Sequence, residues 1–198
     1  MVVTNFTPFP ILTTERLILR QLENADDEDI FSHRSDDRVN KYLEDYRHSS
    51  IAQTQAFIER IQQGVLQNKN IFWVITLHHT NKFIGTICIW NILTKEHKAE
   101  IGYTLDPKFH NMGYMSEALA TVIEYGFQTM KLKTIEAFTH EDNKASIRIL
   151  TKNNFMPDFS LDFTNKKNLV AYTACKITAT NFVTCQKILA LCARSSVG

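Results

Sequence analysis

The sequence has no long run of apolar residues and no long run of one charge. A helix needs about 20 consecutive apolar residues to cross a bilayer, and no window of the 198 residues approaches that length. The N-terminal stretch MVVTNFTPFP lacks the basic start and the apolar segment of a signal peptide. The formal net charge is +1, and Lys and Arg are dispersed. We therefore expect neither a membrane nor a nucleic acid as a partner.

Cysteine is sparse, and its spacing argues against the usual metal motifs. The four cysteines form no CxxC pair, and no pair of histidines stands at ligand spacing. We therefore expect no bound metal, and we expect reduced thiols in a cytoplasmic protein.

The remaining composition is typical of one globular domain. Hydrophobic residues make up 44% of the chain, and 13 of its residues are phenylalanine. A chain of this length can bury a single core. No internal repeat and no low-complexity linker divides it.

Hydrophobic periodicity in the first half indicates strands and two early helices. Alternation over 11–22 predicts a strand. Asn24, followed by an acidic run, predicts a helix start, because carboxylates favour the positive end of a helix. Ser49 and Ser50 precede a second helical pattern. Three short β-rich segments then predict an antiparallel meander: 71–79, 82–90 and 98–106.

The second half alternates helices with strands. Helical spacing of apolar residues begins at Met115, and Asn143 is typical of a cap for a shorter helix that ends near Asn153. The helix that begins near Met115 connects the strand 98–106 to the strand that follows it. Such a connection requires a crossover, so these two strands should be parallel neighbours in the sheet. The strands predicted in this half are 134–139, 159–164 and 168–176.

The segment 107–119, PKFHNMGYMSEAL, joins a strand to the start of the long helix. A helix start offers unpaired backbone N–H groups and a positive dipole end, which suit an anion such as a pyrophosphate. Gly113 permits a close approach of the backbone or a positive φ angle. The segment contains neither GxxxxGK[ST] nor GxGxxG. On the residues alone, it is either an anion site or an ordinary helix-start turn.

Four stretches together resemble the GNAT superfamily of N-acetyltransferases, in the branch that acetylates ribosomal-protein N-termini. They are ILTTERLILRQL, FIGTICIW, AEIGYTLDPKFHNMGYMSEAL and HEDNKASIRILTKNNF. The resemblance spans 11–176 and implies an α/β (α+β) fold. Its mixed, mostly antiparallel sheet of about seven strands should be splayed at the centre and flanked by about four helices. We expect 177–198 to form a C-terminal extension, with a helix suggested by its apolar spacing.

The resemblance also implies an activity. Such an enzyme transfers an acetyl group from acetyl-CoA, its co-substrate, to a primary amine by direct attack in a ternary complex. The amine can be a protein N-terminus or a small molecule, and the enzyme is a monomer or a homodimer. The alternative is a non-catalytic acyl-CoA-binding or structural module of the same fold, because fold does not fix function.

The family pattern places the pyrophosphate against the helix start and the pantetheine arm beside the preceding strand. In this sequence, it implies these cofactor-binding residues: Tyr103, Leu105, His110, Met112, Gly113, Tyr114, Met115, Ser116, Asn143 and Ser146. Asn111 and Met112 depart from the usual Gly and Lys of the loop, and Asn154 replaces another Gly. Asparagine tolerates the left-handed conformation that glycine adopts at such positions.

Two residues are implied as catalytic. Glu100 would accept the amine proton, directly or through water, and Ser146 would protonate the thiolate, with Tyr103 as a weaker candidate. The structural alternatives are an exposed strand carboxylate for Glu100 and a first-turn helix serine for Ser146. Asn143 is also a natural helix cap.

The acceptor side is implied between the first two helices. Tyr42, Glu44, Asp45 and Tyr46 lie where relatives bind the acceptor, and an acidic, aromatic patch would suit a cationic amine. An ordinary solvated loop is the alternative.

Overall fold

The computed structural model describes residues 1–43, 46–159 and 169–175. Within them, eight strands form one sheet in the order β1-β2-β3-β4-β5-β6-β8-β7. All neighbouring strands are antiparallel except β5 and β6, which are parallel. The strands are β1 (Leu12–Thr13), β2 (Leu17–Gln21), β3 (Ile71–Leu77), β4 (Phe83–Leu93), β5 (Lys98–Leu105), β6 (Thr134–His140), β7 (Met156–Pro157) and β8 (Leu169–Cys175).

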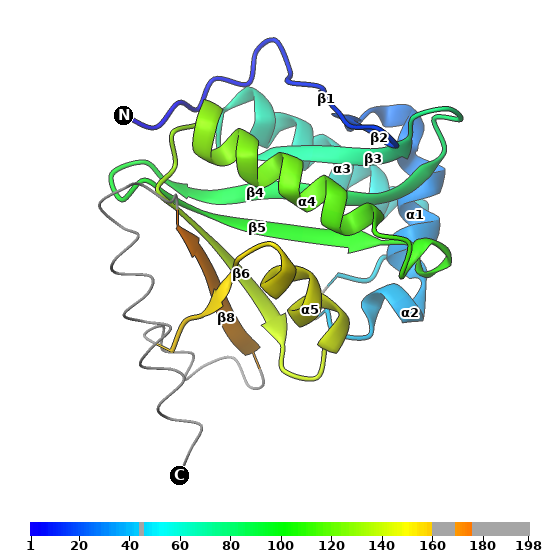
Figure 1. The fold of residues 1–198 in the computed structure, drawn as a ribbon. Coiled ribbons are helices and arrows are strands. Elements are labelled where there is room, and N and C mark those ends of the chain that lie inside the picture. Colours follow the sequence, from blue (N-terminus) through cyan, green and yellow to red (C-terminus); the bar gives the residue numbers. More distant parts are fainter. Residues whose placement is uncertain (44–45, 160–168, 176–198) are drawn as a thin grey trace.

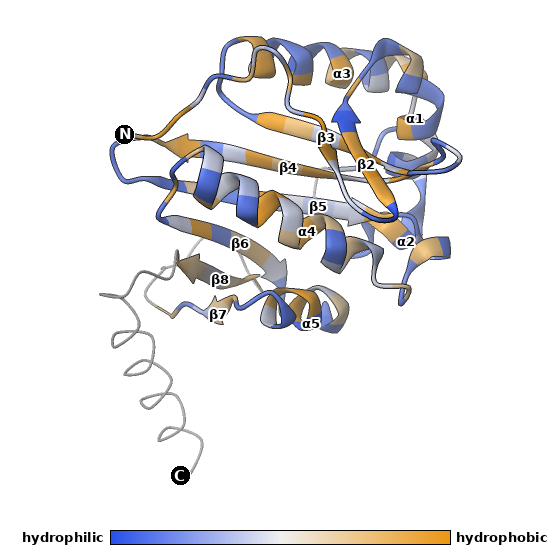
Figure 2. Ribbon diagram, turned by 45° about the horizontal axis from the view of Figure 1, so that its top comes forward, coloured by the Kyte–Doolittle hydropathy of each residue, from blue (hydrophilic) through white to orange (hydrophobic). Residues whose placement is uncertain are grey.

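Helices cover both faces of the sheet (Figure 1). The α-helices are α1 (Asp27–Ser35), α2 (Asp37–Asn40), α3 (Ile51–Leu66), α4 (Tyr114–Glu124) and α5 (Lys144–Lys152). Helices α3 and α4 lie on opposite sides of β3 and β4 (Figures 1 and 2). A π-helical turn, Tyr125–Thr129, continues α4. The structure thus confirms the predicted mixed sheet flanked by helices, with one more strand and one more helix than expected.

The alternation of side chains along β3 divides the core into two clusters. Ile71, Trp73 and Ile75 pack in the larger cluster with α4, whereas Phe72 and Val74 pack with residues of α1 and α3. This explains why all of β3 up to Thr76 is buried, and why the strand is hydrophobic along its length in Figure 2. The larger cluster also includes Val2 and Phe6, so residues N-terminal to position 11 contribute to the core.

Several predicted boundaries change for local reasons. The strand predicted over 11–22 is two strands, because Thr14 and Leu17 close a tight turn in which the Thr14 N–H donates to the Leu17 carbonyl at 2.9 Å. Asn24 is not the cap of the first helix. A capping box between Glu23 and Asp26 begins a 3-10 turn that leads into α1. Ser50, one of the two serines expected to precede the second helix, is the N-cap of α3.

Only some of the elements predicted near the C-terminus fall within the described residues. Strand β8 matches the predicted 168–176. A two-residue strand, β7, precedes the predicted strand 159–164, most of which lies outside the described residues. The predicted helical extension, 177–198, also lies outside them.

Strands β5 and β6 pair over only three positions. Lys98, Ala99 and Glu100 face Thr134, Ile135 and Glu136, and the pairing then stops while β5 continues to Leu105. This confirms the predicted parallel pairing and the expected splaying of the sheet at this point. Gly102 stays in regular register with Cys88 of β4.

No helix within the three described segments is long and apolar enough to span a membrane.

Gly85 should be essential for the close approach of β4 and β5. A Cβ atom at this position would lie 2.3 Å from the Thr104 carbonyl oxygen, and backbone cannot easily move away. We expect Gly85→Ala to lower the free energy of unfolding by about 1–3 kcal/mol, measured by urea denaturation. Gly102→Ala is the matched control, because its Cβ would meet only side-chain atoms at ordinary contact distances, Cys88 Sγ at 3.4 Å and Trp90 Nε1 at 3.9 Å. Equal stability of the two variants would contradict this explanation.

Candidate functional site

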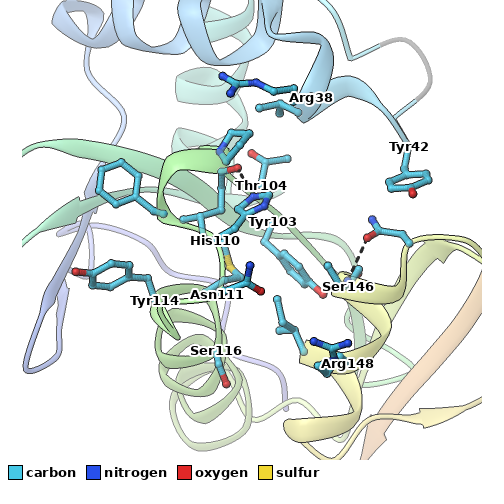
Figure 3. Close-up of a pocket in the computed structure, with 18 of the residues that line it drawn as sticks. Arg38, Tyr42, Tyr103, Thr104, His110, Asn111, Tyr114, Ser116, Ser146 and Arg148 are labelled. Carbon is cyan, nitrogen blue, oxygen red and sulfur yellow. Dashed lines mark hydrogen bonds between the residues drawn. The ribbon is translucent and has the colours of Figure 1, made fainter.

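A cavity of about 780 Å³ lies beside the end of β5 and between α2, the start of α4 and α5 (Figure 3). All the predicted cofactor-binding residues line it except Met112: Tyr103, Leu105, His110, Gly113, Tyr114, Met115, Ser116, Asn143 and Ser146. The divergence of β5 from β6 opens the sheet at this place. The fold therefore brings predicted cofactor-binding residues from distant parts of the sequence to one cavity.

The start of α4 lines this cavity, and its first backbone N–H groups have no acceptor among the residues that the structure describes. Gly113 is the N-cap with φ of 81°, a left-handed conformation that favours glycine. The first main-chain bond inside the helix runs from the Glu117 N–H to the Gly113 carbonyl, so the N–H groups of the three residues between them have no helical acceptor. Asn111 has φ of 61°, a left-handed conformation that asparagine tolerates.

Arg16, from the turn between β1 and β2, braces this loop. Its guanidinium donates to the Met112 carbonyl at 3.0 Å, pairs with Glu117 at 2.6 Å, and stacks 4.5 Å from the centre of the Tyr114 ring. Partial burial raises the pKa of Glu117, but hydrogen bonds from Thr14 and Arg16 outweigh it, and the pKa is lowered. A carboxylate in the first turn of α4 would repel an anion, and Arg16 offsets that charge.

A polar network lies under the cavity at Thr104. The Thr104 hydroxyl is 2.8 Å from His33 Nε2, 2.9 Å from the Thr86 hydroxyl and 3.1 Å from the Tyr46 hydroxyl. His33 is buried, and burial lowers its pKa to about 4, so its imidazole is neutral at pH 7. Behind Tyr46, the buried guanidinium of Arg34 stacks 3.5 Å from the ring centre.

Tyr103 and Ser146 form a hydroxyl pair at the base of the cavity. Their oxygens are 3.0 Å apart, and burial raises the pKa of Tyr103 to about 12. The Ser146 N–H donates to Asn143 Oδ1 at 3.1 Å, which confirms Asn143 as the cap of α5. The cap thus fixes the turn that carries Ser146.

Glu100 lies at the point where β5 and β6 part, on the same strand face as Thr104. Its carboxylate accepts a hydrogen bond from Asn91 Nδ2 at 2.6 Å, and it is not among the residues that line the cavity. The neighbouring Glu136 is buried and pairs with Lys98 at 3.2 Å. Sequence analysis did not identify Glu136, because its significance depends on the pairing of two distant strands.

Sequence analysis also missed the cations of the cavity. Arg38 and Lys41 line it from α2 and the turn after it, while Arg148 and Lys152 line it from α5. The latter two are four residues apart, a spacing that places them on one helix face and could have been read from the sequence. No Asp or Glu is found among the lining residues in the described part of the chain.

Comparison with known proteins identifies the family. Residues 16–156 match the family described as Acetyltransferase (GNAT) domain. The chain is 37% identical over 150 residues to the uncharacterized N-acetyltransferase YoaA of Bacillus subtilis, covering 76% of this chain and 85% of that protein. It is 33% identical over 148 residues to the uncharacterized N-acetyltransferase p20 of Bacillus licheniformis, covering 74% and 83%. The chain belongs to the GNAT acetyltransferase family.

Solved structures agree with the assignment of this chain to the GNAT acetyltransferase family. A GNAT-family acetyltransferase from Bacillus anthracis superposes with a TM-score of 0.72 at 27% identity, covering 84% of this chain and 98% of that one. A ribosomal L7/L12 alpha-N-protein acetyltransferase in complex with coenzyme A gives 0.74 at 17% identity, covering 84% and 98%. The second similarity is one of fold.

The predicted acceptor residues of this acetyltransferase have separate positions. Tyr42 lines the cavity, and its ring centre is 5.4 Å from that of His140 at the end of β6. Tyr46 lies in the Thr104 network. Glu44 and Asp45 lie outside the described residues.

Protonation of His33 should destabilise the fold. The pKa of its imidazole is about 4 in the folded protein, against an ordinary value of 6.5. The unfolded chain therefore binds more protons between these values, and stability falls as the pH drops from 6.5 towards 4. Urea unfolding measures the free energy of unfolding across this pH range. The decrease in this free energy should be smaller in His33→Gln than in the wild-type protein, by up to about 3 kcal/mol.

The matched control is His79→Gln, because His79 is exposed. It should keep the wild-type pH dependence. Burial also lowers the pKa of His48 to about 4, so part of the loss should remain in the His33 variant. An unchanged pH dependence in the His33 variant would contradict the role given to this residue.

Proposed function

We propose that this acetyltransferase transfers an acetyl group from acetyl-CoA to a primary amine by direct attack in a ternary complex. The observation that carries the proposal is the start of α4, whose unpaired N–H groups face the cavity beside the free edge of β5. Family membership supports acetyl transfer, and the coenzyme A complex of the structural neighbour supports the choice of co-substrate.

The diphosphate of acetyl-CoA would bind the N–H groups of Tyr114, Met115 and Ser116. Helix starts bind phosphates through such groups and through the helix dipole. Arg148 and Lys152 line the same cavity from α5 and would attract the phosphates. These two cations of α5 would compensate for the lysine that the resemblance implies at Met112.

The pantetheine arm would extend along β5. On the β6 side, residues 101–105 pair with no described strand. The Leu105 carbonyl contacts His110 Nε2 at 3.1 Å, and the backbone groups of 101–104 on this side are available to an extended ligand. The thioester would then lie towards the point of divergence, between the Tyr103–Ser146 pair and Glu100.

The transfer requires a neutral amine, although a lysine-type amine has a pKa of about 10.4 and an α-amine about 7.7–8.0. We assign Glu100 as the base, acting through water because it does not line the cavity. The neutral amine nitrogen attacks the thioester carbonyl and then loses a proton to solvent water as the C–S bond breaks. The thiolate takes a proton from Ser146, which Tyr103 hydrogen-bonds, and Ser146 regains a proton from water. Burial raises the pKa of Cys88 to about 12, which does not favour an acyl-cysteine intermediate there.

Acetyl-CoA should bind the protein, and Gly113→Asp should weaken binding at least about 10-fold. The side chain would bring negative charge to the phosphate site, and a residue with a Cβ would be strained at the positive φ of this position. Isothermal titration calorimetry of acetyl-CoA measures both affinities. Ala120→Asp is the control, because it adds the same charge to an exposed position of α4 that does not line this cavity. Equal affinity of the wild-type protein and the Gly113 variant would refute the phosphate site.

Glu100→Gln should lower kcat by about 10²–10⁴ with little change in acetyl-CoA affinity, the usual range for loss of a general base. Ser146→Ala should cost less, because a thiolate with a thiol pKa near 8.5 leaves with modest help. The measurement is the pH profile of kcat/KM from thiol release with an accepted amine. A wild-type rate and profile in the Glu100 variant would mean that another group accepts the proton. Binding of acetyl-CoA without thiol release for any amine would favour the non-catalytic alternative.

A further inference from the structure

The aromatic rings on the acceptor side already hold cations of the protein itself. Lys41 Nζ lies 4.9 Å from the centre of the Tyr42 ring, and Arg34 Cζ lies 3.5 Å from the centre of the Tyr46 ring. Such a ring face attracts one cation by its quadrupole, and a second cation would be repelled by the first. The rings are therefore poorly suited to a polycationic amine, contrary to what an acidic, aromatic patch would suggest.

The walls of the cavity are cationic at both ends. Figure 3 shows Arg148 at the same end as Ser116, where the cofactor phosphates are proposed to bind, and Arg38 and Tyr42 at the other end. The cations of α5 thus have a proposed ligand, whereas those near α2 have none. No Asp or Glu within the described segments lines the cavity, and the carboxylate that pairs with Arg38, that of Asp36, is not among the lining residues.

Arg38 is held in a fixed orientation with one donor group left over. Its Nε donates to Asp36 Oδ1 at 3.0 Å, and its Nη2 pairs with Asp36 Oδ2 at 2.6 Å. Nη1 has no hydrogen-bond partner among the residues that the structure describes. Because the side chain is 62% exposed, it can meet a ligand from solvent.

We infer that the acceptor is a primary amine that also carries an anionic group, a carboxylate or a phosphate, and that Arg38 binds this group. The inference rests on the proposed function, whose amine acceptor it narrows. Arg38 and Lys41 attract the anion, and the amine points from there towards the thioester. A charge at this end also selects against polyamines.

The test uses matched pairs of amines that differ in one anionic group. Phenylalanine is compared with phenylalaninamide for the carboxylate, and glucosamine 6-phosphate with glucosamine for the phosphate. Thiol release from acetyl-CoA gives kcat/KM for each amine, and calorimetry on the protein saturated with coenzyme A gives the affinity for pairs that turn over slowly. We expect the anionic member of at least one pair to be preferred about 10-fold or more, the range for one charge-assisted bond.

Arg38→Gln should abolish this preference by raising KM, or Kd, for the anionic member about 10-fold. It should leave the neutral member and acetyl-CoA unchanged. Arg60→Gln is the control, because Arg60 is an exposed arginine on α3 that does not line the cavity. The preferred pair identifies the anion as a carboxylate or a phosphate.

Three results would overturn the inference. They are a preference for the neutral members or for polyamines, binding of neither anionic amine, and an Arg38→Gln variant whose KM rises for acetyl-CoA instead of the acceptor. The last would mean that Arg38 binds the cofactor phosphates. If acetyl-CoA itself does not bind the wild-type protein, the proposed function fails first and this inference falls with it.

Discussion

Beyond Glu100 and Glu136, strands β5 and β6 no longer pair, and the site depends on this divergence. A crossover between parallel strands must leave β5 at its C-terminal end, so the start of α4 is delivered to the same edge that the divergence opens. The free edge of β5 and the donors of α4 therefore face one cavity. Helix α5, which follows β6 (Figure 1), also lines this cavity.

Electrostatic neutralisation explains how this opening suits an anionic cofactor. Glu117 stands in the first turn of α4, and Arg16 pairs with it while also bonding the Met112 carbonyl. The loop therefore keeps its positive helix end although Met112 occupies the position at which the resemblance implies a lysine. Elsewhere in the described chain, the carboxylates nearest the site are paired or hydrogen-bonded: Glu136 with Lys98, Glu100 with Asn91, and Asp36 with Arg38.

Sequence reasoning succeeded where the signal was local. Gly113 and Asn143 mark helix starts by their own chemistry, and both begin helices that line the cavity. It failed where the role depends on a distant partner. Arg16 hydrogen-bonds Glu117, which lies 101 residues away in the sequence, and no sequence periodicity predicts this contact. Helix α2, with Arg38, has four residues, too few to show a helical pattern. The roles of Glu100 and Ser146 stay predictions, because no contact with a substrate fixes them.

Amide hydrogen exchange tests the central claim most directly, because that claim concerns particular N–H groups. With saturating acetyl-CoA, the account predicts slower exchange at Tyr114, Met115 and Ser116 and at the free edge of β5, with little change in α3 on the far face of the sheet. If exchange at the start of α4 does not change in the protein saturated with acetyl-CoA, or if residues elsewhere are protected instead, the proposed phosphate site is wrong.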